Sequence, residues 1–160
     1  MQTHYSQLLI KHGIAAMLVG LFAGFLLIFS LIGGMSLSPV PVLLEFDLPG
    51  TSKGWRIVHM GTLMNGMMAI LIGLAMRAFY LSEAKAFRVF AGIAIAIWGN
   101  FLFYVFGMFA PNHGITLEAN VLGEASMAGA IAFFPALLGA ITSIYALFVL
   151  LFSEPAQEQK

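Results

Sequence analysis

The chain has 160 residues, of which 61% are hydrophobic and only 9% are charged, and its formal net charge at pH 7 is zero. Soluble domains carry about a quarter charged residues, so this composition, with a mean hydropathy of +0.96, indicates a membrane protein. The zero net charge argues against nucleic acid as a partner, and the absence of cysteine excludes disulfides, iron–sulfur clusters and a thiolate ligand for haem iron.

Four stretches are apolar and long enough to cross the hydrocarbon core of a membrane, which takes about 20 residues per helix. They are residues 13–32, 58–80, 87–109 and 125–152. We therefore expect an all-α fold, a four-helix bundle that forms a single transmembrane domain over residues 1–160. The opening sequence MQTHYSQLLIKHG lacks the pattern of a cleaved secretory signal, so we expect the first span to be retained.

The connections between the spans differ in length and composition. Residues 33–57 contain three prolines, which predicts an irregular flap rather than a helix. Residues 81–86 form a short polar turn, and residues 110–124 contain the turn sequence PNHG.

The basic residues predict the orientation of the chain in the membrane. Those on the side of the two termini are Lys11, Arg77, Lys85, Arg88 and Lys160, and those on the other side are Lys53 and Arg56. The excess of positive charge places the termini together in the cytoplasm, since cytoplasmic loops carry more Lys and Arg. We expect an integral protein of the bacterial inner membrane.

Small residues at regular spacing predict close contacts between helices. The first span has Gly20 and Gly24, and the fourth has an alanine at every fourth position (Ala128, Ala132, Ala136 and Ala140). Such rows allow another backbone to approach, and packing within the bundle is the function we assign to them.

A few polar side chains lie within the spans and converge in depth. His59 is in the first turn of the second span, and Asn65 lies about 9 Å deeper at 1.5 Å per residue. The third span runs the opposite way, so Tyr104 and Asn100 lie about 8 and 14 Å below its outer end. These four groups share the outer half of the bundle, whereas His59 and Asn65 are about 120° apart around their helix and should not bind the same atom.

Each of these residues also has an explanation without a binding site. A lone histidine near a helix end can be an interfacial residue hydrated by water, and asparagine within a span often bonds a neighbouring helix. Tyr104 can belong to the ring of aromatic residues found at membrane interfaces. Their shared depth favours a site over these alternatives.

Two sequence runs resemble the styrene oxide isomerase family. They are EFDLPGTSKGWRIVHMGTLMNGMM (45–68) and WGNFLFYVFGMFAPNHGIT (98–116), and KHGIAAM near the start and IGGM at the end of the first span also fit. The resemblance covers about residues 11–125, and the spacing of Pro-Gly, Gly-Trp, His and Met-Asn-Gly-Met-Met is too irregular for a chance match of apolar helices.

The resemblance implies a small four-helix membrane enzyme that forms a trimer, with haem b held between subunits, and that converts aryl epoxides to aldehydes by a Meinwald rearrangement. It implies that His59 is the axial ligand of the haem iron and that Asn65, Asn100 and Tyr104 line the substrate side. This chain departs from the family in having Ala96 in place of an acid and His113 in place of an arginine.

The residues suit this chemistry because no Asp, Glu or Lys lies within the spans, and the ferric haem that the resemblance implies can act as the Lewis acid. Two other functions remain open. A b-type cytochrome usually needs two facing histidines, but the span boundaries place His12 and His59 about 25–30 Å apart. A non-enzymatic membrane scaffold would need no haem.

Overall fold

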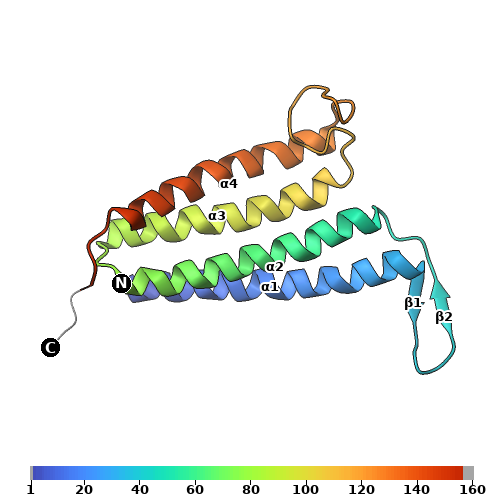
Figure 1. Ribbon diagram of the computed structural model, residues 1–160, viewed down its shortest axis with the longest axis horizontal. Helices are drawn as coiled ribbons and strands as arrows, with labels where there is room; N and C mark the ends of the chain where they lie inside the picture. Colours follow the sequence, from blue (N-terminus) through green and yellow to red (C-terminus); the bar gives the residue numbers. More distant parts are fainter. Residues whose placement is uncertain (1, 157–160) are drawn as a thin grey trace.

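The computed structural model describes residues 2–156, and its main elements are four long helices (Figure 1). The helices are α1 (Gln2–Ile32), α2 (Ser52–Ala75), α3 (Glu83–Gly107) and α4 (Met127–Leu151). The smaller elements are the strands β1 (Gly34–Ser36) and β2 (Leu43–Glu45) and a 3-10 helix, η1 (Met76–Ala78). The expectation of a mostly helical protein with four spans is confirmed.

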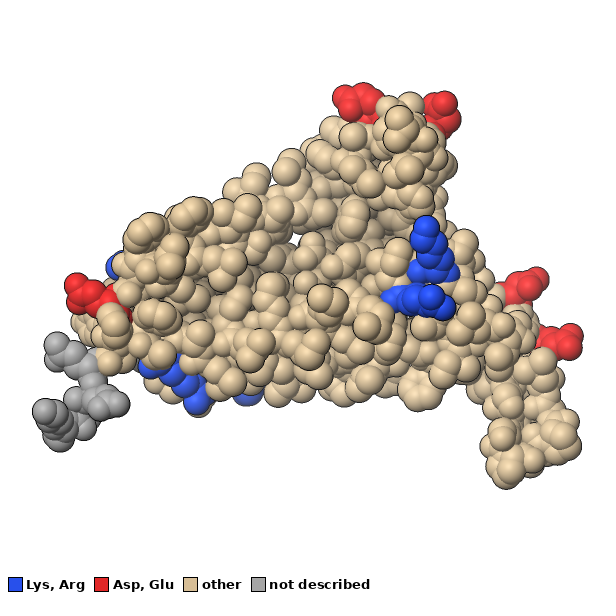
Figure 2. Space-filling view, viewed as in Figure 1, with Lys and Arg blue, Asp and Glu red and all other residues tan. Residues whose placement is uncertain are grey.

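All four helices are long and apolar enough to cross a membrane. In the space-filling view, charged side chains gather toward the two ends of the molecule and leave the central part of the visible face without charge (Figure 2). An uncharged band between charged ends is the distribution that a bilayer requires, because ionised groups are costly in its hydrocarbon core.

The helices pack as two pairs. α1 lies along α2 and α3 lies along α4, while α3 also contacts α1 and α2 and so joins the two pairs (Figure 1). We call the end where α1 leads into β1 and α3 leads into α4 the loop end, and the opposite end the terminus end. At the terminus end, Arg77 Nε donates to Ser6 Oγ at 3.0 Å, and Tyr80 N donates to Glu154 O at 2.7 Å. The first turns of α1 and residues 153–156 therefore lie at the same end of the helices. The face of the membrane that this end meets stays a prediction. Lys160, one of the basic residues used for that prediction, lies outside the described residues.

Hydroxyl side chains set the start of three helices. Thr51, Ser82 and Ser126 are the N-cap residues of α2, α3 and α4, and each side-chain oxygen accepts a hydrogen bond from a backbone N–H in the first turn. This bond satisfies one of the donors that a helix start leaves free.

Several helix boundaries differ from the sequence-based expectation. α2 ends at Ala75 rather than at residue 80, and α3 begins at Glu83, inside the expected turn 81–86. The largest differences are at the starts of α1 and α2. α1 begins at Gln2 rather than near residue 13, because polar residues of its first turns find partners: Ser6 Oγ donates to Gly73 O on α2 at 2.7 Å. α2 begins at Ser52 rather than at residue 58, because Thr51 caps it. Hydropathy finds the part of a helix that suits lipid and misses the polar turns that extend beyond it.

The flap between α1 and α2 is not wholly irregular. β1 and β2 pair antiparallel, with Met35 opposite Leu44, and the resulting β-hairpin projects sideways from the end of α1 (Figure 1). The prolines do not prevent this pairing, since Pro39 and Pro41 lie in the connection between the strands. Proline is excluded from paired strand positions but not from turns.

The small residues pack closely, but not always where expected. A methyl group at Gly20 would lie 3.0 Å from the Leu63 side chain of α2, so the predicted contact of the first span is confirmed. On α4, Ala132 is fully buried beside Gly114 of the loop that follows α3, whereas Ala140 is exposed, and Gly139 makes the close contact with α3 instead. A row at every fourth residue drifts around a helix of 3.6 residues per turn, so it cannot face one neighbour along its whole length.

The apolar core lies toward the terminus end. It joins residues from all four helices and includes Leu9, Ala69, Ile72, Met76, Leu81, Ala86, Val89, Ile93, Ile97, Ala146 and Leu150. The polar residues singled out by the sequence lie nearer the loop end, beyond this core.

Candidate active site

Asn65, Asn100 and Tyr104 form a hydrogen-bonded group between α2 and α3. Asn65 Nδ2 donates to the Tyr104 hydroxyl at 3.4 Å, and Asn100 Nδ2 donates to Asn65 Oδ1 at 3.4 Å. Asn65 is buried, and the other two are partly buried. The expectation that these three residues converge is confirmed.

The directions of these hydrogen bonds leave one donor, the Tyr104 O–H, able to bond to another molecule. Because Tyr104 accepts from Asn65, its own O–H hydrogen can donate to another molecule. Asn100 fixes the carbonyl side of the Asn65 amide and thereby directs the Asn65 NH₂ toward Tyr104. Asn65 and Asn100 can therefore hold the Tyr104 O–H in one fixed direction between apolar helices.

His59 lies close to this group in the chain but faces another helix. Its Nδ1 lies 2.7 Å from the carbonyl oxygen of Gly20 on α1, and the residue is partly buried. A carbonyl oxygen only accepts, so Nδ1 carries the proton and donates, which leaves Nε2 with its lone pair. The expectation that His59 and Asn65 point in different directions agrees with these partners.

The setting of His59 would suit a histidine that holds haem iron. Metal-binding histidines commonly donate their second ring N–H to a backbone carbonyl, which fixes the tautomer and strengthens the binding nitrogen. The bond to Gly20 O has this form, and Nε2 is the nitrogen available to a metal. Among residues 2–156, no group of three or more His, Asp or Glu side chains could hold a metal ion.

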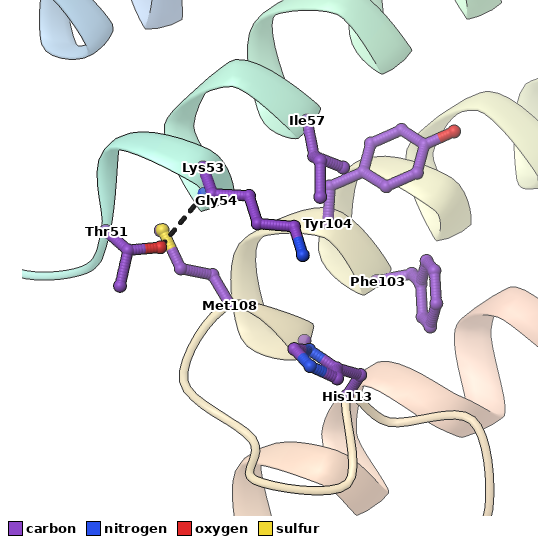
Figure 3. Close-up of a pocket in the computed structure, with 9 residues that line it drawn as sticks. Thr51, Lys53, Gly54, Ile57, Phe103, Tyr104, Met108 and His113 are labelled. Carbon is purple, nitrogen blue, oxygen red and sulfur yellow. Dashed lines mark hydrogen bonds between the residues drawn. The ribbon is translucent and has the colours of Figure 1, made fainter. Parts of the chain in front are cut away.

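A pocket of about 240 Å³ adjoins the polar group at the loop end (Figure 3). Its lining residues come from the start of α2, the end of α3 and the loop that follows: Thr51, Lys53, Gly54, Ile57, Phe103, Tyr104, Gly107, Met108 and His113. The Tyr104 ring forms one wall, and its hydroxyl points away from Lys53 and His113 (Figure 3). The pocket is thus lined by two nitrogen-bearing side chains, Lys53 and His113, and by two aromatic rings, Phe103 and Tyr104.

Sequence analysis did not identify most of this lining. Lys53 was considered only as one of the basic residues that predict the membrane orientation, and His113 only as a position where the chain differs from the family. Phe103 and Met108 gave no signal, because an apolar residue in a span does not reveal whether it faces lipid, a helix or a pocket.

Thr62 is a second unexpected feature of α2. Its side chain is fully buried, and among the described residues its Oγ1 is the buried side-chain polar atom without a hydrogen-bond partner. It lies one turn from both His59 and Asn65. An unsatisfied buried hydroxyl carries a desolvation cost, and such groups are rare in native structures.

His12 lies away from the site and has its own partner. Trp98 Nε1 donates to His12 Nδ1 at 3.0 Å, deep between α1 and α3. His59 contacts α1 at Gly20, so His12 lies about 12 Å away along that helix at 1.5 Å per residue. The expected 25–30 Å is too large, because α1 extends to Gln2 and His12 lies inside it. His12 turns toward Trp98 on α3, whereas His59 turns toward α1, so the two imidazoles point to different helices.

The fold and site define a class of protein before any comparison is made. Four apolar helices, a lone imidazole with a fixed tautomer, and a polar group beside an apolar pocket are features of a membrane enzyme with a buried site for a small apolar molecule.

Comparison with known proteins narrows this class. The family model described as styrene oxide isomerase matches residues 5–154. The chain is 32% identical over 139 residues to the styrene-oxide isomerase of Pseudomonas fluorescens, an alignment that covers 87% of this chain and 82% of that protein. The chain belongs to the styrene oxide isomerase family, and it is an isomerase. The predicted resemblance is confirmed, and the match extends through the fourth helix, beyond residue 125.

Proposed function

We propose that this protein converts aryl epoxides, such as styrene oxide, to aldehydes within the membrane, with ferric haem b as cofactor. In this rearrangement the C–O bond at the benzylic carbon breaks, a hydride moves from the neighbouring carbon to the benzylic carbon, and the remaining C–O bond becomes a carbonyl. No atom is gained or lost, and there is no net redox change. Family membership supports the substrate class.

The observation that carries the proposal is the hydrogen-bonded group of Asn65, Asn100 and Tyr104. Because Tyr104 accepts from Asn65, its O–H hydrogen can donate to the epoxide oxygen and orient the ring. Asn65 and Asn100 hold that hydroxyl in place and add amide groups that can contact the substrate. A positioned donor of this kind stabilises negative charge as it develops on oxygen.

His59 would hold the haem through Nε2, while Nδ1 donates to Gly20 O. When bound, ferric haem b would supply a Lewis acid toward the epoxide oxygen, a role for which no carboxylic acid is present within the spans. The apolar lining beside Tyr104 would exclude water, which would otherwise trap the benzylic cation as a diol.

We further propose that the protein forms a homotrimer in the bacterial inner membrane, with its termini in the cytoplasm and the haem between neighbouring subunits. The close packing around small residues such as Gly20 and Ala132 supports a haem site between subunits rather than inside one. Native mass spectrometry of the haem-loaded protein is expected to give a trimer. A monomer that retains haem would contradict this assembly.

The test of function uses the ferric protein purified in detergent. Styrene oxide is added without an electron donor, and phenylacetaldehyde is followed by gas chromatography. We expect aldehyde in the ferric form and a large fall after reduction with dithionite, since ferrous iron is a weaker Lewis acid. A b-type cytochrome would show reversible reduction and no aldehyde, and a scaffold would show no Soret band.

A further inference from the structure

Two glycines lie directly beneath the two side chains on which the proposed function depends. A methyl group built at Gly24 on α1 would lie 2.9 Å from His59 Nδ1 and 3.0 Å from His59 Cε1. A methyl group at Gly61 on α2 would lie 2.4 Å from Tyr104 Cε2 and 2.7 Å from Tyr104 Cζ. Non-bonded carbon atoms prefer about 3.5–4.0 Å, so neither ring could keep its place beside alanine.

The two contacts are linked through one turn of α2. His59 leaves this turn toward α1, and Gly61, two residues later, receives Tyr104 from α3. The rings of His59 and Tyr104 are thereby placed relative to each other by a single rigid segment. We propose that Gly24 and Gly61 are positioning residues, which act through His59 and Tyr104 and set the geometry between the haem ligand and the phenol. This inference rests on the proposed function.

The hydrogen bonds of both rings show why a small displacement matters. Tyr104 Cζ carries the hydroxyl that accepts from Asn65 at 3.4 Å, which is near the limit of a hydrogen bond. Pushing Cζ away from Gly61 therefore breaks this bond and frees the hydroxyl to rotate. A displaced His59 ring likewise loses its 2.7 Å contact with Gly20 O, which fixes the tautomer.

The first test is Gly61→Ala, with Gly92→Ala as its matched control. A methyl at Gly92 would lie 2.7 Å from Thr142 O, between α3 and α4, so it creates a similar close contact away from both rings. We expect G61A to lower kcat about 100-fold, the loss typical of a displacement of about 1 Å at a reacting group, with little change in KM. G92A is expected to keep its kcat. Folding of both variants is checked by size-exclusion chromatography and thermal unfolding.

A double-mutant cycle separates positioning from packing. If Gly61 acts through the Tyr104 hydroxyl, adding G61A to Tyr104→Phe should change kcat by less than about twofold, because the group it positions is already absent. If G61A lowers kcat by the same factor in the wild type and in Y104F, the proposal is overturned. A G61A protein that fails to fold while G92A folds would also overturn it, since Gly61 would then serve packing alone.

The Gly24 part is tested without activity or haem. In protein labelled with ¹⁵N-histidine, the His59 ring nitrogens report which of them carries the proton. We expect the wild type to show Nδ1–H and Gly24→Ala to show a mixture of tautomers or a shift of the Nδ1 signal. An unchanged His59 spectrum in G24A would overturn this part. In G61A protein labelled with ¹³C-tyrosine, a shifted Tyr104 Cζ signal would show that Gly61 positions the ring. If Y104F nevertheless has wild-type activity, Gly61 still positions Tyr104, but Tyr104 has no catalytic role.

Discussion

The two ends of the helices are built differently. At the terminus end, Leu9, Met76 and Ile93 are fully buried in one apolar cluster, and Ser6 of α1 bonds to Gly73 of α2 at 2.7 Å and to Arg77 of η1 at 3.0 Å. At the loop end, the bonds between Asn65, Asn100 and Tyr104 measure 3.4 Å and a pocket opens beside them.

This difference separates two tasks within one bundle. In a membrane, helices associate mainly through close packing and interhelical hydrogen bonds, so the dense terminus end holds the fold together. The loop end leaves space for a pocket, and its Asn65–Asn100–Tyr104 group is held by long hydrogen bonds, whereas His59 makes a short one to Gly20 O. Substitutions at the loop end should affect chemistry, and substitutions at the terminus end should affect stability.

The largest effect is expected for His59→Ala at the loop end. It removes the proposed iron ligand, so we expect loss of the Soret band and of isomerase activity by about 100-fold or more, which exceeds the 10- to 100-fold loss typical of an outer-shell partner. The protein should still unfold at a temperature near that of the wild type. The control is His12→Ala, which should keep the Soret band. A normal haem spectrum in H59A would refute the assignment.

Tyr104→Phe should lower kcat about 100-fold, or about 2.7 kcal/mol, because it removes a hydrogen-bond donor to a developing negative charge. The ring still fills its place beside Gly61, so the Soret band and thermal stability should not change. Steady-state kinetics with styrene oxide measure this effect. Activity within about twofold of the wild type would show that Tyr104 does not act on the substrate.

Much of this contrast could be predicted from the sequence. The number of spans and the convergence of Asn65, Asn100 and Tyr104 follow from hydropathy and the rise per residue, and the structure agrees, whereas the polar first turns of α1 and α2 were missed. The partner of His59 could not be predicted, because its bond to Gly20 O depends on how two helices are rotated against each other. The β-hairpin was missed because strands of three residues next to prolines give almost no periodic signal.

Ile93→Ala tests the terminus end. Ile93 is fully buried in the apolar cluster, so truncation should leave a cavity and lower the free energy of unfolding by about 2–3 kcal/mol. Chemical denaturation in mixed detergent micelles measures the change. The kcat of the protein that remains folded should equal the wild-type value. A fall in the kcat of folded I93A would show that the terminus end also affects the chemistry at the loop end.

Thr62→Val should have the smallest effect, and its sign is informative. Valine keeps the shape and removes a buried hydroxyl without a partner, so we expect stabilisation by about 1 kcal/mol and no change in kcat. Thr62→Ser retains the hydroxyl and serves as the control. Destabilisation by T62V, reversed in T62S, would show that the hydroxyl has a partner in the working enzyme.

The pairing of α1 with α2 and of α3 with α4 has a consequence for biosynthesis. The ribosome completes the first pair before the second, so the contact of His59 with Gly20 can form while α3 is still being made. Asn65 lacks its hydrogen-bond partners until α3, which carries Asn100 and Tyr104, is inserted. The proposed catalytic group is therefore completed only when the last two helices join, so a chain that stops translation after α2 would have the His59–Gly20 contact but none of the bonds between Asn65, Asn100 and Tyr104.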